Sequence, residues 1–275
     1  VQPDEALKIF ATALPVVPLT HRVKGVPGKP DPADAAATIQ SIEQAVALVK
    51  AGDASAIVTN PIAKEGLYAS GFKYPGHTEF LGHLSDVLYG VTAQPVMMLW
   101  SPDLAVVPAT IHVALSAVPK QLTLELLLST TRIVAQDLRQ HFGLATPRIV
   151  LTGLNPHAGE GGAMGREEIE IIAPAIALLR AEGLNVTGPH PADTLFHAAK
   201  RSTYDVVIAM YHDQALIPLK TLAFDSGVNV TLGLPFVRTS PDHGTAFDIA
   251  GQGLANPASL IEALRLAARL TGERA

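Results

Sequence analysis

The strongest constraint on the fold is an alternation of short apolar runs with longer stretches whose apolar residues recur at helical spacing. The short runs predict buried strands, because a strand covered on both faces reads as a continuous apolar segment. Six such runs lie at residues 56–59, 95–99, 104–107, 148–151, 205–209 and 228–231. Strands that alternate with helices predict an α/β fold with a largely parallel sheet.

The intervening stretches predict three clear helices. The first spans residues 34–50 and has Gly52 as its stop signal. A second begins at Pro119, and a third spans residues 167–183 with Pro174 as an expected kink. No internal repeat, low-complexity tract or flexible linker marks a domain boundary, so the periodicity predicts elements more firmly than domains.

Composition excludes several classes of protein. Hydrophobic residues make up 48% of the 275 residues and charged residues 16%, which is typical of a chain with a large core. The formal net charge of -5, without a Lys/Arg cluster, argues against a nucleic-acid partner. The apolar stretches are too short for a membrane span. The absence of cysteine excludes disulfides, favours a cytoplasmic location and limits metal ligands to imidazole and oxygen.

Three histidines follow predicted strands at equivalent places. Ligands of open α/β sheets bind beyond the carboxyl ends of the strands, so the polar residues that follow each run are the candidates for chemistry. His112, His157 and His212 each occupy such a position on a different strand. One histidine there is more often structural, whereas three make a catalytic metal site, with Zn²⁺ or Co²⁺, an equal alternative to structural roles. Asp213 could then provide an oxygen ligand or orient His212.

The segment from Tyr74 to Phe80 predicts a loop that opens a helix, with Thr78 as the N-cap. Free backbone N–H groups at such a start bind anions, and His77 could add a donor. An ordinary capped helix is the alternative. The glycines at residues 159–165 do not fit a Rossmann fingerprint, and we expect them to let the backbone turn closely around the histidine site.

Five longer sequence motifs resemble those of the 4-hydroxythreonine-4-phosphate dehydrogenase family. They are GHTEF (76–80), LNPHAGEGG (154–162), PADTLF (191–196), MYHDQ (210–214) and GVNVTLGLP (227–235). These motifs occur in the same order as in the family and extend over nearly the whole chain. Residues 242–251, followed by Asn256-Pro257, also resemble the nucleotide loop of isopropylmalate dehydrogenases. The resemblance therefore implies two α/β domains around a cleft, as in isocitrate and isopropylmalate dehydrogenases.

The resemblance also assigns roles to individual residues. It implies that three histidines bind a divalent metal (Zn, Co or Mg) across the interface of a homodimer: His112, His157 and His212. It implies a set of substrate contacts at His77, Thr78, Lys220, Asn229 and Arg238. Asp193, Asp213 and Lys220 are the candidates for the catalytic base, and their roles stay open. NAD, or alternatively NADP, would contact His243, Gly244, Asp248 and Asn256.

Domain limits follow from the same resemblance. We expect a domain with the NAD loop at residues 1–75 and 236–275, and a metal- and substrate-binding domain at 76–235. Family members begin with a strand–turn–helix that carries a G-D-P-x-G-I-G-P-E type segment, which this sequence lacks. A truncated chain, an N-terminus outside the sequence given and a misplaced start site are the open explanations.

The implied reaction is an NAD- and metal-dependent oxidation of a small phosphorylated amino acid, 4-phosphohydroxy-L-threonine. Its product, 2-amino-3-oxo-4-phosphooxybutanoate, loses carbon dioxide to give 3-amino-2-oxopropyl phosphate, which serves vitamin B6 synthesis. Three alternatives remain. They are a sibling dehydrogenase of a phosphorylated four-carbon sugar acid or a cis-dihydrodiol dicarboxylate, a phosphate acyltransferase, and an inactive binding protein.

Overall fold

The computed structural model describes residues 1–272, apart from the side chain of Glu65. The chain forms two compact units, Val1–Pro95 with Leu234–Ala275 and Val96–Gly233. We expected a domain boundary near residue 75, whereas the two units divide after residue 95. The reason is that the helix α4 (His77–Leu84) packs in the first unit. Its Phe80 and Leu81 share a buried cluster with Ile57 and Phe236.

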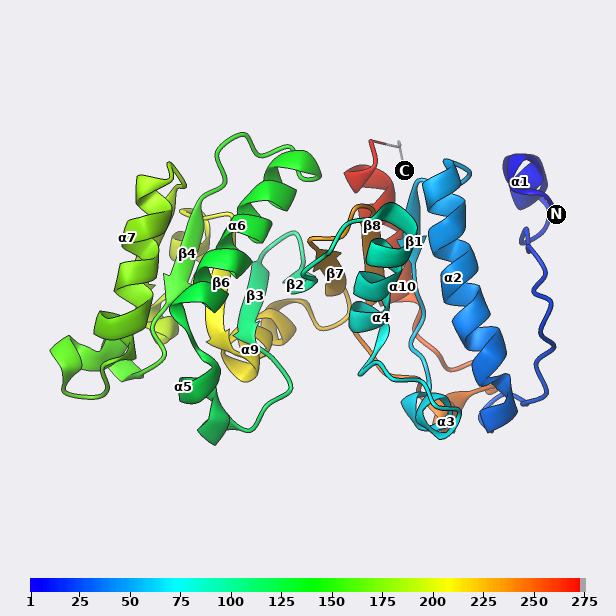
Figure 1. Cartoon of the computed structure of the whole chain (residues 1–275), viewed down its shortest axis with the longest axis horizontal. Helices are drawn as coiled ribbons and strands as arrows, with labels where there is room; N and C mark the ends of the chain where they lie inside the picture. The colour runs from blue at the N-terminus through cyan, green and yellow to red at the C-terminus, as the bar shows by residue number, and fades with distance from the viewer. Residues whose placement is uncertain (273–275) are drawn as a thin grey trace. The chain divides into compact units, whose positions relative to one another are not determined.

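The first unit contains two parallel strands, β1 (Ala56–Val58) and β8 (Val237–Pro241), in which Ile57 is paired with Arg238. Its longer helices are α2 (Ala35–Ala51), α4 and α10 (Ala258–Leu270), and its shorter ones are α1 (Ala6–Phe10) and α3 (Lys64–Ala69) (Figure 1). Gly52 ends α2 in the left-handed region, as its position after the apolar stripe predicts. One-turn 3-10 or π segments lie at Pro3–Glu5, Pro32–Asp34, Ser85–Tyr89 and Phe247–Ile249.

The second unit is built on six strands in the order β7-β2-β3-β6-β4-β5. Their bounds are β2 (Val96–Trp100), β3 (Ala105–Thr110), β4 (Ile149–Thr152), β5 (Val186–His190), β6 (Val206–Tyr211) and β7 (Val228–Leu232). β3, β6, β4 and β5 are parallel, whereas β2 runs antiparallel to both β3 and β7. The α/β prediction is confirmed.

Helices cover this sheet. They are α5 (Val118–Gln121), α6 (Leu124–Gln140), α7 (Ala173–Ala181), α8 (Ala198–Arg201) and α9 (His212–Ala223), with short 3-10 or π segments at Leu115–Ala117, Pro156–Gly162, Glu168–Ile172 and Ala192–Thr194. The helix expected from Pro119 is two helices, because Thr123 is extended and caps α6 by accepting from the Leu126 N–H. Pro174 lies in the first turn of α7, directly after the π turn Glu168–Ile172.

All six predicted strands are present, and two further strands were not predicted. β5 contains Gly188 and Pro189, residue types that are rare in strands, but a proline is tolerated because β5 lies at the end of the strand order. β8 carries the buried polar residues Arg238, Thr239 and Ser240, so hydrophobic patterning did not reveal it. Both misses reflect tertiary context that overrides local pattern.

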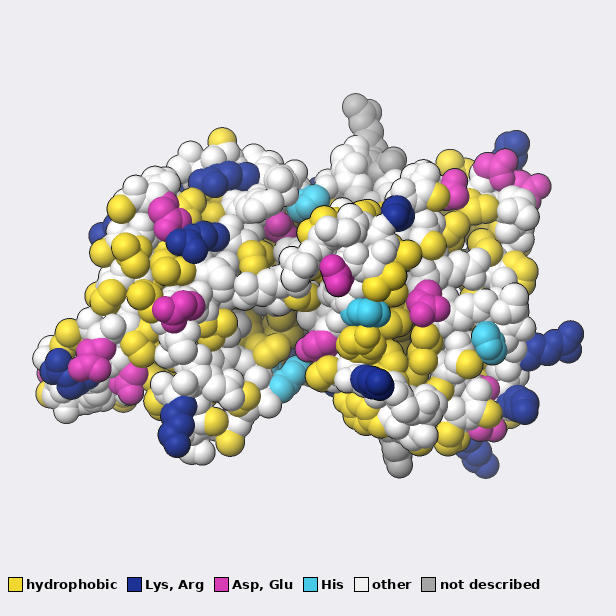
Figure 2. All heavy atoms as spheres, in the orientation of Figure 1, with side chains coloured by type: hydrophobic (Ala, Val, Ile, Leu, Met, Phe, Trp, Pro, Cys, Tyr) yellow, Lys and Arg dark blue, Asp and Glu magenta, His cyan; other side chains and the backbone are white. Residues whose placement is uncertain are grey.

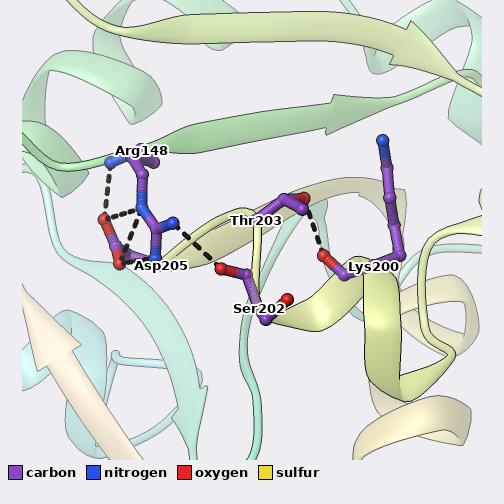
Figure 3. A network of polar contacts seen from close by, with 5 residues as sticks. All are labelled: Arg148, Lys200, Ser202, Thr203 and Asp205. Carbon is purple, nitrogen blue, oxygen red and sulfur yellow. Dashed lines mark hydrogen bonds and ion pairs between the residues drawn. The ribbon is translucent and has the colours of Figure 1, made fainter.

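Arg148 and Asp205 join the amino ends of β4 and β6 (Figure 3). The Arg148 N–H donates to Asp205 Oδ2 at 2.7 Å, and Arg148 Nη2 lies 2.7 Å from Asp205 Oδ1. Arg148 Nη1 also donates to the carbonyl of Ser202 at 3.0 Å. This pair fixes the ends of the two strands that lead toward the predicted histidine site.

On the face drawn in Figure 2, lysine and arginine side chains are scattered among apolar and acidic ones, and the described residues form no continuous basic stripe there. No helix within residues 1–272 is long and apolar enough to cross a membrane.

Candidate active site

Three parallel strands deliver the three predicted histidines to one edge of the second unit's sheet. β6 pairs in parallel with both β3 and β4. His112 follows β3, His157 follows β4, and His212 is the first residue of α9, directly after β6. All three therefore lie beyond carboxyl strand ends, where α/β proteins bind their ligands.

His112 and His212 come together within one chain. Their ring centroids are 5.8 Å apart. His212 Nδ1 lies 2.7 Å from Asp213 Oδ1, which fixes the ring and leaves Nε2 for another partner. Together with Leu115, Val118 and other residues, both rings line a pocket of about 310 Å³. The arrangement provides two imidazoles beside an apolar wall.

His157 does not join this pair in the same chain. Within residues 1–272, no three His, Asp or Glu side chains form a group that could hold a metal ion. A catalytic zinc site normally has three protein ligands, so the imidazole pair fits a metal only with a further ligand from elsewhere. His157 is exposed at the surface of its loop and could provide that ligand to a second copy of the chain.

Two of the three histidines, His112 and His157, occupy strained backbone. The described residues other than glycine that have positive φ are His112, His157, Ala158, Glu160 and Ala246. Such conformations cost free energy and concentrate at functional sites. All of them lie in segments that the sequence marked as candidate sites.

Two further candidates for the catalytic base, Asp193 and Lys220, lie in the same unit. Asp193 is exposed in the turn Ala192–Thr194, which Tyr204 supports by donating its buried hydroxyl to the Leu195 carbonyl at 2.9 Å. Burial raises the pKa of Tyr204 to about 12, so this hydroxyl stays a donor. Lys220 lies on α9, two turns after Asp213 on nearly the same helix face. Asp193 thus follows β5, whereas Asp213 and Lys220 lie on the helix that follows β6.

Asn229 projects from β7 and has a buried side-chain oxygen. Among the described residues, no hydrogen-bond partner is found for Asn229 Oδ1. Buried polar atoms are nearly always satisfied, by protein, water or ligand. The predicted substrate contact therefore has an acceptor in need of a donor.

A cationic cluster in the first unit contains His77, Arg238 and Lys64, since the charges of the last two act on the imidazole. Arg238 is 4% exposed, and its Nη2 donates to Thr59 Oγ1 at 2.7 Å, just beyond β1. Burial lowers the pKa of Arg238 to about 10. Burial also lowers the pKa of His77 to about 4, with the charges of Arg238 and Lys64 acting in the same direction. His77 is therefore neutral at physiological pH and can donate to an anion without carrying charge.

The start of α4 differs from the prediction. Gly76, not Thr78, is the N-cap, and no side chain caps the helix there. A Cβ atom on Gly76 would lie 3.6 Å from Lys64 Nζ, so the ammonium reaches the first turn of α4. The predicted N-cap at Thr78 is wrong, although the backbone N–H groups of this turn and the nearby cations still suit an anion.

The predicted nucleotide contacts lie on one loop between β8 and α10. His243, Gly244, Asp248 and Asn256 are all exposed. Asn256 Oδ1 accepts from the Ala258 N–H at 3.0 Å and so anchors the start of α10. Ala246, at φ 46, bends the loop between these contacts. The four residues thus lie on one exposed segment of the first unit.

Sequence reasoning missed Lys64, Thr59 and Glu168. Thr59 is the last residue of the first predicted strand and Lys64 follows it, so the same strand-end rule could have identified them. Glu168 is 3% exposed and contacts the His157 loop, but the sequence signalled only an acidic helix start. Its burial is a tertiary property.

Two α/β units, with a histidine pair at strand ends of one and a cationic cluster in the other, fit an enzyme that handles a small anionic substrate. More specifically, the chain belongs to the family described as pyridoxal phosphate biosynthetic protein PdxA, whose model matches residues 2–267. The resemblance drawn from the motifs is confirmed, as is membership of an oxidoreductase family.

Individual relatives agree with this assignment. The chain is 64% identical over 272 residues to 4-hydroxythreonine-4-phosphate dehydrogenase of Methylorubrum populi, covering 98% of this chain and 78% of the relative. The crystal structure of the enzyme of that name from Klebsiella pneumoniae matches with a TM-score of 0.82 and 43% identity, over 90% of this chain and 73% of that one. A terephthalate 1,2-cis-dihydrodiol dehydrogenase from Burkholderia xenovorans is 35% identical with a TM-score of 0.65, over 91% and 77% of the two chains.

Proposed function

We propose that this chain oxidises 4-phosphohydroxy-L-threonine with NAD or NADP in a divalent-metal-dependent reaction of vitamin B6 synthesis. The observation that carries the proposal is the placement of His112, His157 and His212 beyond three parallel strands of one sheet. The family relationship supports the substrate class. The site then needs ligands for a metal, contacts for the substrate and a surface for the nucleotide.

The metal site is assigned to His112 and His212 of one chain with His157 of a second copy. Nitrogen ligands favour zinc or cobalt over magnesium. A bound divalent ion supplies Lewis-acid stabilisation of developing alkoxide charge. Because the described residues of one chain offer no group of three ligands, the proposal requires a homodimer with the same patch used twice.

The protein's own residues then divide the remaining work. Asp213 orients His212 through its hydrogen bond, so we assign it a positioning role. Asp193 and Lys220 are left as candidates for the base that accepts the hydroxyl proton. The buried oxygen of Asn229 suits a donor such as the substrate's amino group.

The cationic cluster is assigned to the substrate's phosphate. Arg238 provides a buried guanidinium for a paired contact with phosphate oxygens, and neutral His77 can add a hydrogen-bond donor. Thr78 lies in the first turn of α4 and adds backbone and hydroxyl donors. The exposed loop with His243, Gly244, Asp248 and Asn256 would bind NAD. The bound NAD would accept the hydride from the substrate carbon.

Production of NADH from 4-phosphohydroxy-L-threonine, measured with zinc, cobalt and magnesium in turn, tests this function. We expect turnover only with a divalent ion, and we expect 3-amino-2-oxopropyl phosphate as the final product. An absence of NADH with every ion and with both nucleotides would contradict the proposal and favour a binding protein.

A sibling dehydrogenase is the second candidate, supported by the 35% identity to a cis-dihydrodiol dehydrogenase. The same assay with a phosphorylated four-carbon sugar acid and with a cis-dihydrodiol dicarboxylate separates the two. A kcat/KM for either compound that exceeds the value for the amino substrate would favour the sibling.

A further inference from the structure

The loop that carries His157 has an unusual backbone. His157, Ala158, Gly159, Glu160 and Gly161 are consecutive residues in the left-handed region, with φ values of 53, 51, 78, 43 and 67 degrees. For residues with a Cβ this conformation is unfavourable, and it normally occurs at single positions. A run of five therefore needs contacts from outside the loop to hold it.

Glu168 supplies those contacts from the turn that follows the loop. Its carboxylate is buried, and Oε1 accepts from the Asn155 N–H at 2.8 Å. Oε2 accepts from Asn155 Nδ2 at 3.0 Å, and Glu167 Oε2 accepts from the same nitrogen at 2.7 Å. The Asn155 carbonyl in turn accepts from the Ala158 N–H at 3.1 Å, which closes the first turn of the loop around His157.

Glycines let the loop wrap closely around this carboxylate. A Cβ atom on Gly159 would lie 2.6 Å from Glu168 Oε2, and one on Gly153 would lie 3.0 Å from Oε1. A Cβ atom on Gly165 would lie 2.3 Å from Asn155 Nδ2. The carboxylate of Glu168 and the amide of Asn155 thus occupy space that side chains at these positions would fill, which gives the glycine-rich stretch a purpose other than nucleotide binding.

We propose that Glu168 is a positioning residue that acts through Asn155 to hold the left-handed loop, and so presents His157 as a metal ligand. The proposal rests on the metal site described under Proposed function. Partners that orient a ligand typically change metal affinity by roughly 10–100-fold when they are removed. Glu168 differs from such partners because it does not touch the imidazole. It orders the backbone on the N-terminal side of His157 instead.

The test uses Glu168→Gln, because glutamine keeps the shape but turns one acceptor into a donor that faces Asn155 Nδ2. Glu170→Gln is the matched control, since Glu170 lies in the same turn and its carboxylate makes an exposed ion pair with Arg166. Cobalt affinity and the visible spectrum of bound cobalt are measured for both proteins. We expect Glu168→Gln to bind cobalt roughly 10–100-fold more weakly with an altered spectrum, and Glu170→Gln to match the wild type.

Two further variants keep the outcomes separable. His157→Ala tests the metal site itself: unchanged cobalt binding in this variant would overturn the proposed triad, and the role of Glu168 with it. If His157→Ala loses cobalt while Glu168→Gln retains wild-type affinity and spectrum, only the positioning role is overturned. The double variant should lose no more affinity than His157→Ala alone, because Glu168 acts through His157.

Folding is controlled by circular dichroism and Tm. If Glu168→Gln fails to fold, Asn155→Ala decides, since it removes the two side-chain bonds but keeps the backbone N–H that Glu168 accepts. A folded Asn155→Ala protein with weaker cobalt binding and a changed spectrum supports the proposal. Wild-type cobalt binding in that protein overturns it.

Discussion

The two ends of the parallel strands in the second unit are built differently. At the amino ends, Arg148 and Asp205 satisfy each other through several short contacts, with backbone in ordinary conformations (Figure 3). At the carboxyl ends, His112 and His157 have positive φ, and His212 is held by Asp213. One end therefore stabilises the fold locally, while the other spends stability to present side chains.

This difference teaches where substitutions should separate stability from function. Removing contacts at the amino ends should lower the free energy of unfolding and leave ligand binding intact. Removing histidines at the carboxyl ends should weaken ligand binding and leave the free energy of unfolding nearly unchanged, because an exposed ligand contributes little to packing.

The largest effect is expected for His112→Ala, His157→Ala and His212→Ala. Each should lose most of its bound metal and lower kcat/KM by roughly a thousandfold, since Lewis-acid stabilisation contributes several kcal/mol. Metal analysis by mass spectrometry and Tm measurements check this. Full metal occupancy in all three variants, or a large loss of Tm in each, would break the comparison.

Mixtures of these variants sharpen the same point. Co-refolded His112→Ala and His157→Ala chains should recover about a quarter of wild-type activity, because half of the dimers are mixed and each mixed dimer has one complete site. His112→Ala with His212→Ala is the control and should recover none, since these two rings adjoin in the same chain. Equal recovery in both mixtures would disprove the shared site.

A smaller loss is expected at Arg238, with Arg148→Ala as the control. Arg238→Ala should lower kcat/KM for the phosphorylated substrate by an amount that corresponds to roughly 2–4 kcal/mol of transition-state stabilisation. This is the usual cost of a lost buried charge contact, and the KM for NAD should change little. Arg238→Lys should restore part of it, because a point charge cannot reproduce the two-pronged contact. Steady-state kinetics decides; an unchanged kcat/KM would remove Arg238 from the substrate site.

The smallest effect is expected at the amino ends. Burial raises the pKa of Asp205, but hydrogen bonds from the Arg148 side chain and N–H, with the guanidinium charge, outweigh it and hold the pKa below its ordinary value. This carboxylate therefore stabilises the fold above its unfolded pKa of about 3.9, and the contribution is lost as pH falls through the lower folded pKa. Asp205→Asn should cost roughly 1 kcal/mol near pH 7.

Denaturant unfolding at several pH values measures this contribution. The difference between wild type and Asp205→Asn should shrink as the solution is acidified, while cobalt affinity stays at the wild-type value throughout the neutral range. A difference that does not depend on pH would show that the carboxylate charge is not what stabilises these strand ends.

The sequence by itself determined the fold class, six of the strands and the family. These rest on local properties, namely apolar runs, helical spacing and long sequence motifs, which do not depend on distant contacts. It also placed His112, His157 and His212 after strands, and the parallel order of β3, β6 and β4 puts those strand ends at one edge.

Only the tertiary structure decided how these residues meet. It paired His112 with His212 and separated His157, moved α4 into the first unit, and made β8 a strand despite its polar residues. It also buried Glu168 inside a left-handed loop. The physical reason is shared: burial, strain and ring-to-ring distance depend on groups far apart in the chain, and local propensity carries no information about them.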